Sequence, residues 1–142
     1  MFSSTGVLAL RAVLVIAMWP DEKPASTGAI AKRLGAPRNY LSKVLNRLTR
    51  QGVLLSTRGP GGGYRLLLSP EDLSVSNIVA EFERPRQADA CLMGGPCDPD
   101  DPCVAHGQWR ELKDRTSTLY DTTTIADFMA DVRTNEPLRR TS

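Results

Sequence analysis

Acidic residues are missing from a long stretch of this sequence. Between Ala25 and Ser69 there is no Asp or Glu, although the 142-residue chain has sixteen of them. The eight basic residues of that stretch are Lys32, Arg33, Arg38, Lys43, Arg47, Arg50, Arg58 and Arg65. Such a block is typical of a surface that binds a polyanion, although a solvated surface without acids has the same composition. From residue 70 onward, fourteen acidic residues outnumber eight basic ones, so the net charge of +2 hides a strong asymmetry along the chain.

Histidine is almost absent, because His106 is the single one in the chain. That leaves little for acid–base catalysis, in which histidine is the most frequent participant. The sequence also lacks a nucleophile–base pair and the closely spaced cysteine triplets of radical enzymes. We therefore predict that the protein is not an enzyme and has no small-molecule substrate.

Long apolar runs are lacking as well. The run from Val7 to Trp19 is interrupted by Arg11, is too short to span a bilayer and has no small-residue cleavage site after it. The three cysteines are an odd number. We expect a cytoplasmic protein with no membrane partner, in which disulfides are rare and clustered cysteines indicate metal or redox chemistry.

The periodicity of apolar residues predicts a mainly α chain with a small β-hairpin wing. Helices are expected at residues 4–18, 26–35, 37–51, 74–83, 104–120 and 123–132, and strands at 53–58 and 64–69 around "GPGGG". Ser26 or Thr27 suits an N-cap, and Thr124 with Asp127 resembles a capping box. Helix, short turn, helix and glycine-tipped hairpin is the order of a winged helix-turn-helix.

The second helix of that unit has the pattern of a DNA reader. Its apolar residues Leu41, Val44, Leu45 and Leu48 follow the spacing of one buried face. The opposite face carries Arg38, Asn39, Ser42, Lys43, Asn46, Arg47 and Arg50. Such a face suits a major groove, with its first residues at base edges and later arginines on phosphates. Tyr40 either donates to a phosphate or packs between helices.

The hairpin tip, "RGPGGGYR", predicts a wing that approaches DNA. Gly61 and Gly62 allow positive φ and remove side chains, so backbone can come close to another backbone. Arg58 and Arg65 flank the tip and suit a minor groove. A glycine-rich loop also cradles phosphate in nucleotide sites, but no Lys-Ser/Thr pair follows here.

All three cysteines and the histidine lie within "CLMGGPCDPDDPCVAH". Thiolates and an imidazole suit zinc or an iron–sulfur cluster, and the wide, even spacing of Cys91, Cys97 and Cys103 fits a larger inorganic core better than a single ion. His106 is a candidate fourth ligand. The intervening aspartates are expected to form turns. Structural zinc, a metal-free thiol switch and unligated thiols stay open as alternatives.

The motif "RGPGGGY" and the cysteine stretch followed by "HGQWRELKDR" resemble the Rrf-type (type two) family of bacterial winged-helix iron–sulfur regulators. The resemblance covers about Ser4 to Met129 and is greatest to the IscR-like branch. It implies a homodimer with a long dimerisation helix, and Cys91, Cys97, Cys103 and His106 as ligands of a cluster, with 2Fe–2S favoured and 4Fe–4S possible. Val7 stands where the nitric-oxide-sensing branch has an acidic residue, which counts against that ligand set.

Together these patterns predict a transcriptional regulator, expected to be a repressor. Its affinity for a palindromic operator in double-stranded DNA would depend on a cluster that senses redox, nitric oxide or iron status. The expected division is a DNA-binding domain at 1–84, a cluster-binding loop at 85–103, a dimerisation helix and C-terminal helix at 104–135, and a flexible tail at 136–142. The spacing of Trp109, Leu112, Thr116 and Leu119 suits a helix pair, either with a partner or with the first helix of the same chain.

Overall fold

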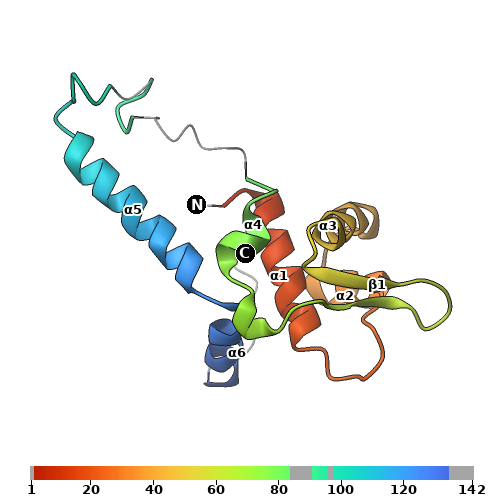
Figure 1. The fold of residues 1–142 in the computed structure, drawn as a ribbon. Helices are drawn as coiled ribbons and strands as arrows, with labels where there is room; N and C mark the ends of the chain where they lie inside the picture. The colour runs from red at the N-terminus through yellow and green to blue at the C-terminus, as the bar shows by residue number, and fades with distance from the viewer. Residues whose placement is uncertain (1, 84–90, 96–97, 135–142) are drawn as a thin grey trace.

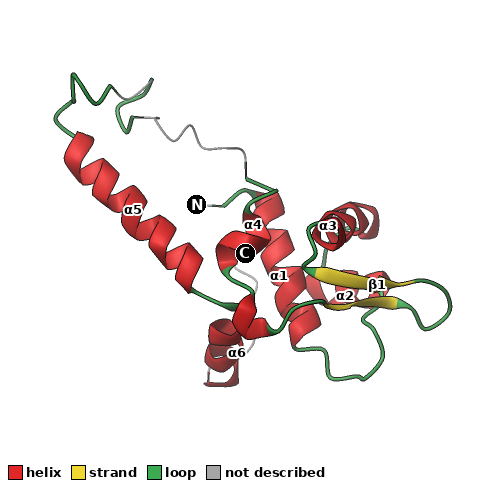
Figure 2. Ribbon diagram, in the orientation of Figure 1, coloured by secondary structure: helices red, strands yellow, loops and turns green. Residues whose placement is uncertain are grey.

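The computed structural model describes residues 2–83, 91–95 and 98–134 and has the expected fold class (Figure 1). The helices are α1 (Ser4–Ala17), α2 (Thr27–Leu34), α3 (Arg38–Arg50), α4 (Val75–Val79), α5 (His106–Thr122) and α6 (Ile125–Thr134), with a 3-10 turn η1 at Pro70–Asp72. Strands β1 (Leu54–Thr57) and β2 (Gly63–Leu66) form an antiparallel hairpin (Figure 2). None of the described helices is long and apolar enough to cross a bilayer.

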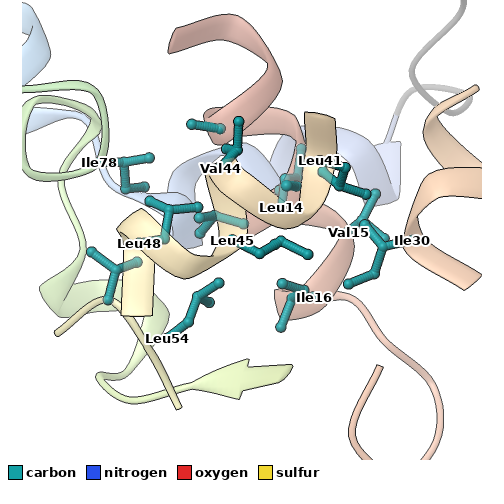
Figure 3. Packing of buried hydrophobic residues seen from close by; sticks show 14 of the residues in the cluster. Leu14, Val15, Ile16, Ile30, Leu41, Val44, Leu45, Leu48, Leu54 and Ile78 are labelled. Atoms are coloured by element: carbon teal, nitrogen blue, oxygen red, sulfur yellow. The ribbon is translucent and has the colours of Figure 1, made fainter. Parts of the chain in front are cut away.

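Helix α1 is the centre of the core. It contacts α2, α3, α4, α6 and β2, and its residues from Ala12 to Ile16 are all buried. The predicted inner face of α3 packs against it, with Leu41, Leu45 and Leu48 at 0% exposure (Figure 3). Apolar residues in this spacing leave water together on one side of a helix, so α3 turns its polar face outward.

The caps of the helices follow the sequence signals. The Ser26 hydroxyl accepts from the Ala29 amide, and Gly35 ends α2 in the left-handed conformation at φ 62°. At α6, the Asp127 carboxylate accepts from the amide and the hydroxyl of Thr124 at 2.8 and 2.9 Å. These hydrogen bonds, first the one from the backbone, lower the pKa of Asp127.

Helix α4 and both strands are shorter than predicted. Helix α4 ends at Val79 rather than at residue 83, and the Phe82 amide bonds the Val79 carbonyl three positions back instead of the i→i−4 carbonyl of an α-helix. Strand β1 loses one residue at each end, and β2 begins one residue earlier than predicted but ends at Leu66 rather than at residue 69. Phe82 is buried beside α4, so tertiary packing takes over where the helical pattern continues in the sequence.

Helix α5 extends away from the rest of the molecule, with its first turn and the cysteine loop at the far end (Figure 1). None of its described residues is buried. Tyr120 lies against its own chain, with its ring centroid 4.5 Å from that of Phe2. Leu112 and Leu119 of the predicted apolar stripe are 55% and 59% exposed, whereas its other members, Trp109 and Thr116, are half-buried.

Candidate nucleic-acid interface and cysteine loop

The outer face of α3 is the largest group of predicted site residues that the structure brings together. Arg38, Asn39 and Lys43 are exposed, and they lie within the first two turns of the helix. The Ser42 hydroxyl donates to the Arg38 carbonyl at 3.0 Å, which leaves its oxygen able to accept a hydrogen bond. This polar face and the buried leucines opposite it have the geometry of a recognition helix.

Two predicted DNA contacts on α3 have partners within the chain. The Tyr40 hydroxyl shares a hydrogen bond with the Thr5 hydroxyl of α1, although its side chain stays 42% exposed. The Arg47 guanidinium donates to the Glu81 carbonyl, lies 3.9 Å from the Glu81 carboxylate and stacks 4.6 Å from the centroid of the Phe82 ring. Sequence reasoning missed both contacts, because they join residues 34 or more positions apart.

The glycines of the wing have different local surroundings. A Cβ on Gly62 would lie 2.2 Å from the Thr57 carbonyl oxygen, and one on Gly63 would lie 2.3 Å from that of Ala25. Gly61 has φ +75° and nothing within 4 Å of its Cβ position. The close backbone approach expected of this loop therefore occurs within the chain at Gly62 and Gly63, and Gly61 at the tip is open.

The wing is tied to both helices of the helix-turn-helix. The amide and carbonyl of Tyr64 pair with those of Ala25, just before α2, at 2.8 and 3.0 Å. The Tyr64 hydroxyl donates to the Asn46 side chain of α3 at 3.3 Å. Arg65 is exposed and donates to the Glu22 carbonyl, whereas Arg58 is exposed at the tip. The wing and α3 are therefore held as one unit, and Tyr64 is a residue that sequence reasoning did not single out.

The cysteine loop brings two of its predicted ligands together. The Sγ atoms of Cys91 and Cys103 lie 3.4 Å apart, and a turn at Gly94 and Gly95 is closed by the Cys91 amide bonding the Gly95 carbonyl at 3.0 Å. Both glycines have positive φ, 93° and 81°. The Asp98 carboxylate accepts from the Asp100 amide at 2.9 Å, as expected of a turn former.

Of the other two predicted ligands, the structure describes only His106. Cys97 lies outside the described residues, and among the residues that are described no three His, Cys, Asp or Glu side chains converge on a common point. His106 is the first residue of α5, and its amide bonds the Cys103 carbonyl at 3.0 Å. His106 therefore follows Cys103, the second thiol of the pair, by less than one helical turn.

Comparison with known proteins identifies the chain. The family model described as an iron-dependent transcriptional regulator, Rrf2, matches residues 2–131. The chain belongs to the Rrf2 family. A curated relative, the HTH-type transcriptional regulator IscR of Aliivibrio salmonicida, is 32% identical over 129 residues, which are 91% of this chain and 77% of that protein. This Rrf2 protein is accordingly a DNA-binding transcriptional regulator and not an enzyme.

Solved structures agree with this membership. The IscR of T. potens is 26% identical with a TM-score of 0.77. The matched region covers 99% of this chain and 93% of the IscR chain. CymR, the global cysteine regulator of B. subtilis, is 24% identical with a TM-score of 0.78 and covers 92% of this chain and 96% of its own. The Rrf2 chain thus has the winged-helix fold that its sequence predicts.

The geometry of the Rrf2 cysteine loop fits a metal with thiolate ligands. Tetrahedral coordination with metal–sulfur bonds of about 2.3 Å places two thiolates of one metal roughly 3.8 Å apart. The observed 3.4 Å between Cys91 and Cys103 needs only a small separation to meet that spacing. Both thiols are also reachable from solvent. Soft sulfur ligands select zinc or iron–sulfur clusters, so the donor set suits either.

Proposed function

We propose that this Rrf2 protein is a homodimeric repressor whose operator affinity is governed by an iron–sulfur cluster, with 2Fe–2S favoured and 4Fe–4S possible. The observation that carries the proposal is the 3.4 Å approach of Cys91 and Cys103 in the loop before α5. The proposed ligands are Cys91, Cys97, Cys103 and His106. When bound, the cluster would supply the chemistry that responds to redox, nitric oxide or iron status.

The proposed DNA contacts lie on α3 and the wing. Exposed Arg38, Asn39 and Lys43 suit base edges or nearby phosphates, and the remaining candidates suit the backbone of the duplex. Those remaining candidates are Tyr40, Ser42, Arg47, Arg58, Gly61, Gly62 and Arg65. A homodimer would read two half-sites about 34 Å apart in a palindromic operator, one turn of B-form DNA.

The proposed division of labour follows the chain. Residues 1–84 bind DNA, residues 85–103 hold the cluster, and residues 104–135 carry the dimer contact, followed by a tail at 136–142. Leu112 and Leu119 support the dimer contact, because both are more than half exposed on a helix that stands away from the body (Figure 2). A partner helix would remove this apolar area from water.

The test begins with anaerobic purification, followed by absorbance and Mössbauer spectra and iron and sulfide analysis. We expect visible absorbance that Cys97→Ser abolishes, together with a change in operator affinity. A coupling of roughly 1–3 kcal/mol would change the dissociation constant about 5- to 150-fold. Fresh protein without iron and sulfide would contradict the cluster, and equal operator binding with and without it would contradict the sensing.

The same 3.4 Å distance favours one second candidate, a metal-free thiol switch. A disulfide needs sulfurs about 2.05 Å apart, so the two atoms would have to move closer together. Cys91 and Cys103 would together lose two protons and two electrons to a small disulfide oxidant, which is reduced to two thiols. Cys97→Ser separates the candidates, because it removes a cluster ligand but leaves this pair intact. A colourless protein that contains zinc would indicate the third reading, a structural metal.

A further inference from the structure

The chain just before the cysteine loop is fastened at three consecutive residues. Arg47 of α3 donates to the Glu81 carbonyl, faces the Glu81 carboxylate at 3.9 Å and lies 4.6 Å from the centroid of the Phe82 ring. The next residue, Glu83, accepts from the Ser3 amide at 2.9 and 3.1 Å and from the Ser3 hydroxyl at 2.9 Å. We call the contacts of Arg47 with Glu81 and Phe82 the Arg47 clasp.

The position of the clasp links the two halves of the proposed sensor. Arg47 belongs to α3, the helix proposed to enter DNA, and Cys91 follows Phe82 by nine positions in the sequence. Figure 1 shows the described part of the cysteine loop at the far end of α5, well away from α3. Glu81 and Phe82 are therefore where the described chain ahead of the cysteine loop meets the recognition helix.

The clasp is also suited to being opened and closed. The side chains of Arg47 and Glu81 are 42% and 55% exposed, and exposed ion pairs exchange readily with solvent. A planar guanidinium combines the carbonyl, the carboxylate and the ring in one arrangement, which a lysine ammonium does not reproduce. Any strain that reaches residues 81–83 therefore acts on the orientation of Arg47 and, through it, on α3.

We propose that Arg47 is a positioning residue that couples the state of the cysteine loop to the recognition helix. The inference rests on the proposed function. With the clasp closed, α3 is held against Glu81 and Phe82, which follow α4, and a change in the loop alters that hold. Loss of an ordinary phosphate contact would weaken operator binding equally in both cluster states. Loss of the clasp reduces the difference in operator affinity between the two cluster states.

The test compares two clasp variants with two matched controls in the full-length protein. Arg47→Lys keeps the positive charge but loses the planar fork, and Glu81→Lys repels Arg47 without altering it. Arg33→Lys makes the same exchange at another arginine that lies over an aromatic ring, Trp19, at 5.9 Å. Glu71→Lys makes the same charge reversal at an exposed site on η1.

The main measurement is the ratio of operator dissociation constants for apo and cluster-loaded protein, by fluorescence anisotropy. We expect the clasp variants to lower the wild-type ratio at least fivefold or bring it to one, with unchanged visible absorbance and thermal midpoint. The controls should keep the ratio within twofold. Clasp variants that retain the wild-type ratio overturn the inference while the proposed function stands.

Amide hydrogen exchange of residues 38–50 gives a second readout that needs no cluster. Apo Arg47→Lys and Glu81→Lys should exchange faster in α3 than apo wild type, and the controls should not. Unchanged exchange in both clasp variants overturns the inference. A wild-type protein without iron, or with a ratio of one, overturns the proposed function and the coupling claim with it.

Discussion

Gly63 begins β2 where the wing pairs with Ala25, the residue before the N-cap of α2. A Cβ at this position would lie 2.3 Å from the Ala25 carbonyl oxygen and 2.9 Å from the Ser26 amide nitrogen. Both neighbours are backbone, so neither can rotate away. The Ala25–Tyr64 pairing, which holds the wing to the helix-turn-helix, therefore depends on the absence of a side chain next to it.

Gly63→Ala should lower the free energy of unfolding by roughly 1–3 kcal/mol, the usual cost of overpacking a tight contact. Urea denaturation followed by circular dichroism measures it. Gly28→Ala is the control, because Gly28 lies in α2 and an added Cβ meets only the Arg38 side chain at 3.9 Å. There we expect a gain of about 0.4–1 kcal/mol from reduced freedom of the unfolded chain. Equal midpoints for both variants would contradict the close approach.

At the scale of elements, α5 has two different apolar sides. Tyr120 packs on Phe2 of the same chain, whereas Leu112 and Leu119 are turned to solvent. An amphipathic helix that buries none of its residues in its own chain gains little stability from packing, so a second helix on its exposed side would complete it. The leucines are thus the residues on which the proposed dimer depends.

Replacing both Leu112 and Leu119 by Glu should weaken the dimer at least tenfold, because each carboxylate would have to be desolvated in the contact. Sedimentation equilibrium at micromolar concentration measures the dissociation constant. Ser117→Glu is the control, because this exposed position lies on the opposite side of α5 and adds a charge away from the two leucines. A wild-type protein that is itself monomeric at these concentrations would contradict the proposed interface.

The capping box of α6 makes a pH-dependent contribution to stability. Hydrogen bonds from Thr124 lower the pKa of Asp127 below its ordinary value of 3.8, so the folded state favours the carboxylate. The stabilisation is complete above that value and is lost as the pH falls through the lowered pKa. Asp127→Asn should therefore unfold more easily than wild type at neutral pH, and the difference should vanish in acid. Thermal midpoints between pH 2 and pH 7 test this; a constant difference would contradict it.

On the scale of the whole molecule, charge is divided between the two parts of the chain. The acid-free stretch forms α2, α3 and the hairpin, and the acidic part contains the cysteine loop, α5 and α6. Binding to DNA should therefore be driven by phosphate neutralisation on one side of the molecule and should weaken steeply with salt. The acidic part would be repelled by the same duplex, which favours one orientation.

Lys43→Gln should make the logarithmic salt dependence of operator affinity shallower by about one per protomer, because each phosphate contact contributes about 0.9 to the slope. Fluorescence anisotropy between 50 and 300 mM salt measures the slope. Arg110→Gln removes an equal charge from exposed α5 and should leave the slope unchanged. The same loss of slope in both variants would show a general charge effect and contradict the assignment of Lys43.

Much of the DNA-binding unit was predictable from the sequence, because its signals are local. Leu41, Leu45 and Leu48 share one side of a helix by spacing alone, and all three are buried in α3. The less predictable elements lie where local signals compete with packing. The pattern after Val79 reads as helix, yet Phe82 leaves the helical path to enter the core. In the cysteine loop, residue type and spacing predicted which side chains are metal ligands. Among the described residues, the structure adds that the sulfurs of Cys91 and Cys103 lie 3.4 Å apart.

The sequence by itself determined the order and approximate place of the helices, the caps of α2 and α6 and which face of α3 turns inward, since these depend on neighbours a few positions apart. Only the tertiary structure decided that Arg47 contacts Glu81 and Phe82. It also decided that the Ala25 carbonyl leaves no room for a Cβ on Gly63, and that Leu112 and Leu119 are exposed to solvent. These contacts join residues far apart in the chain. Their energies depend on how whole elements pack, and no local pattern of residues encodes that arrangement.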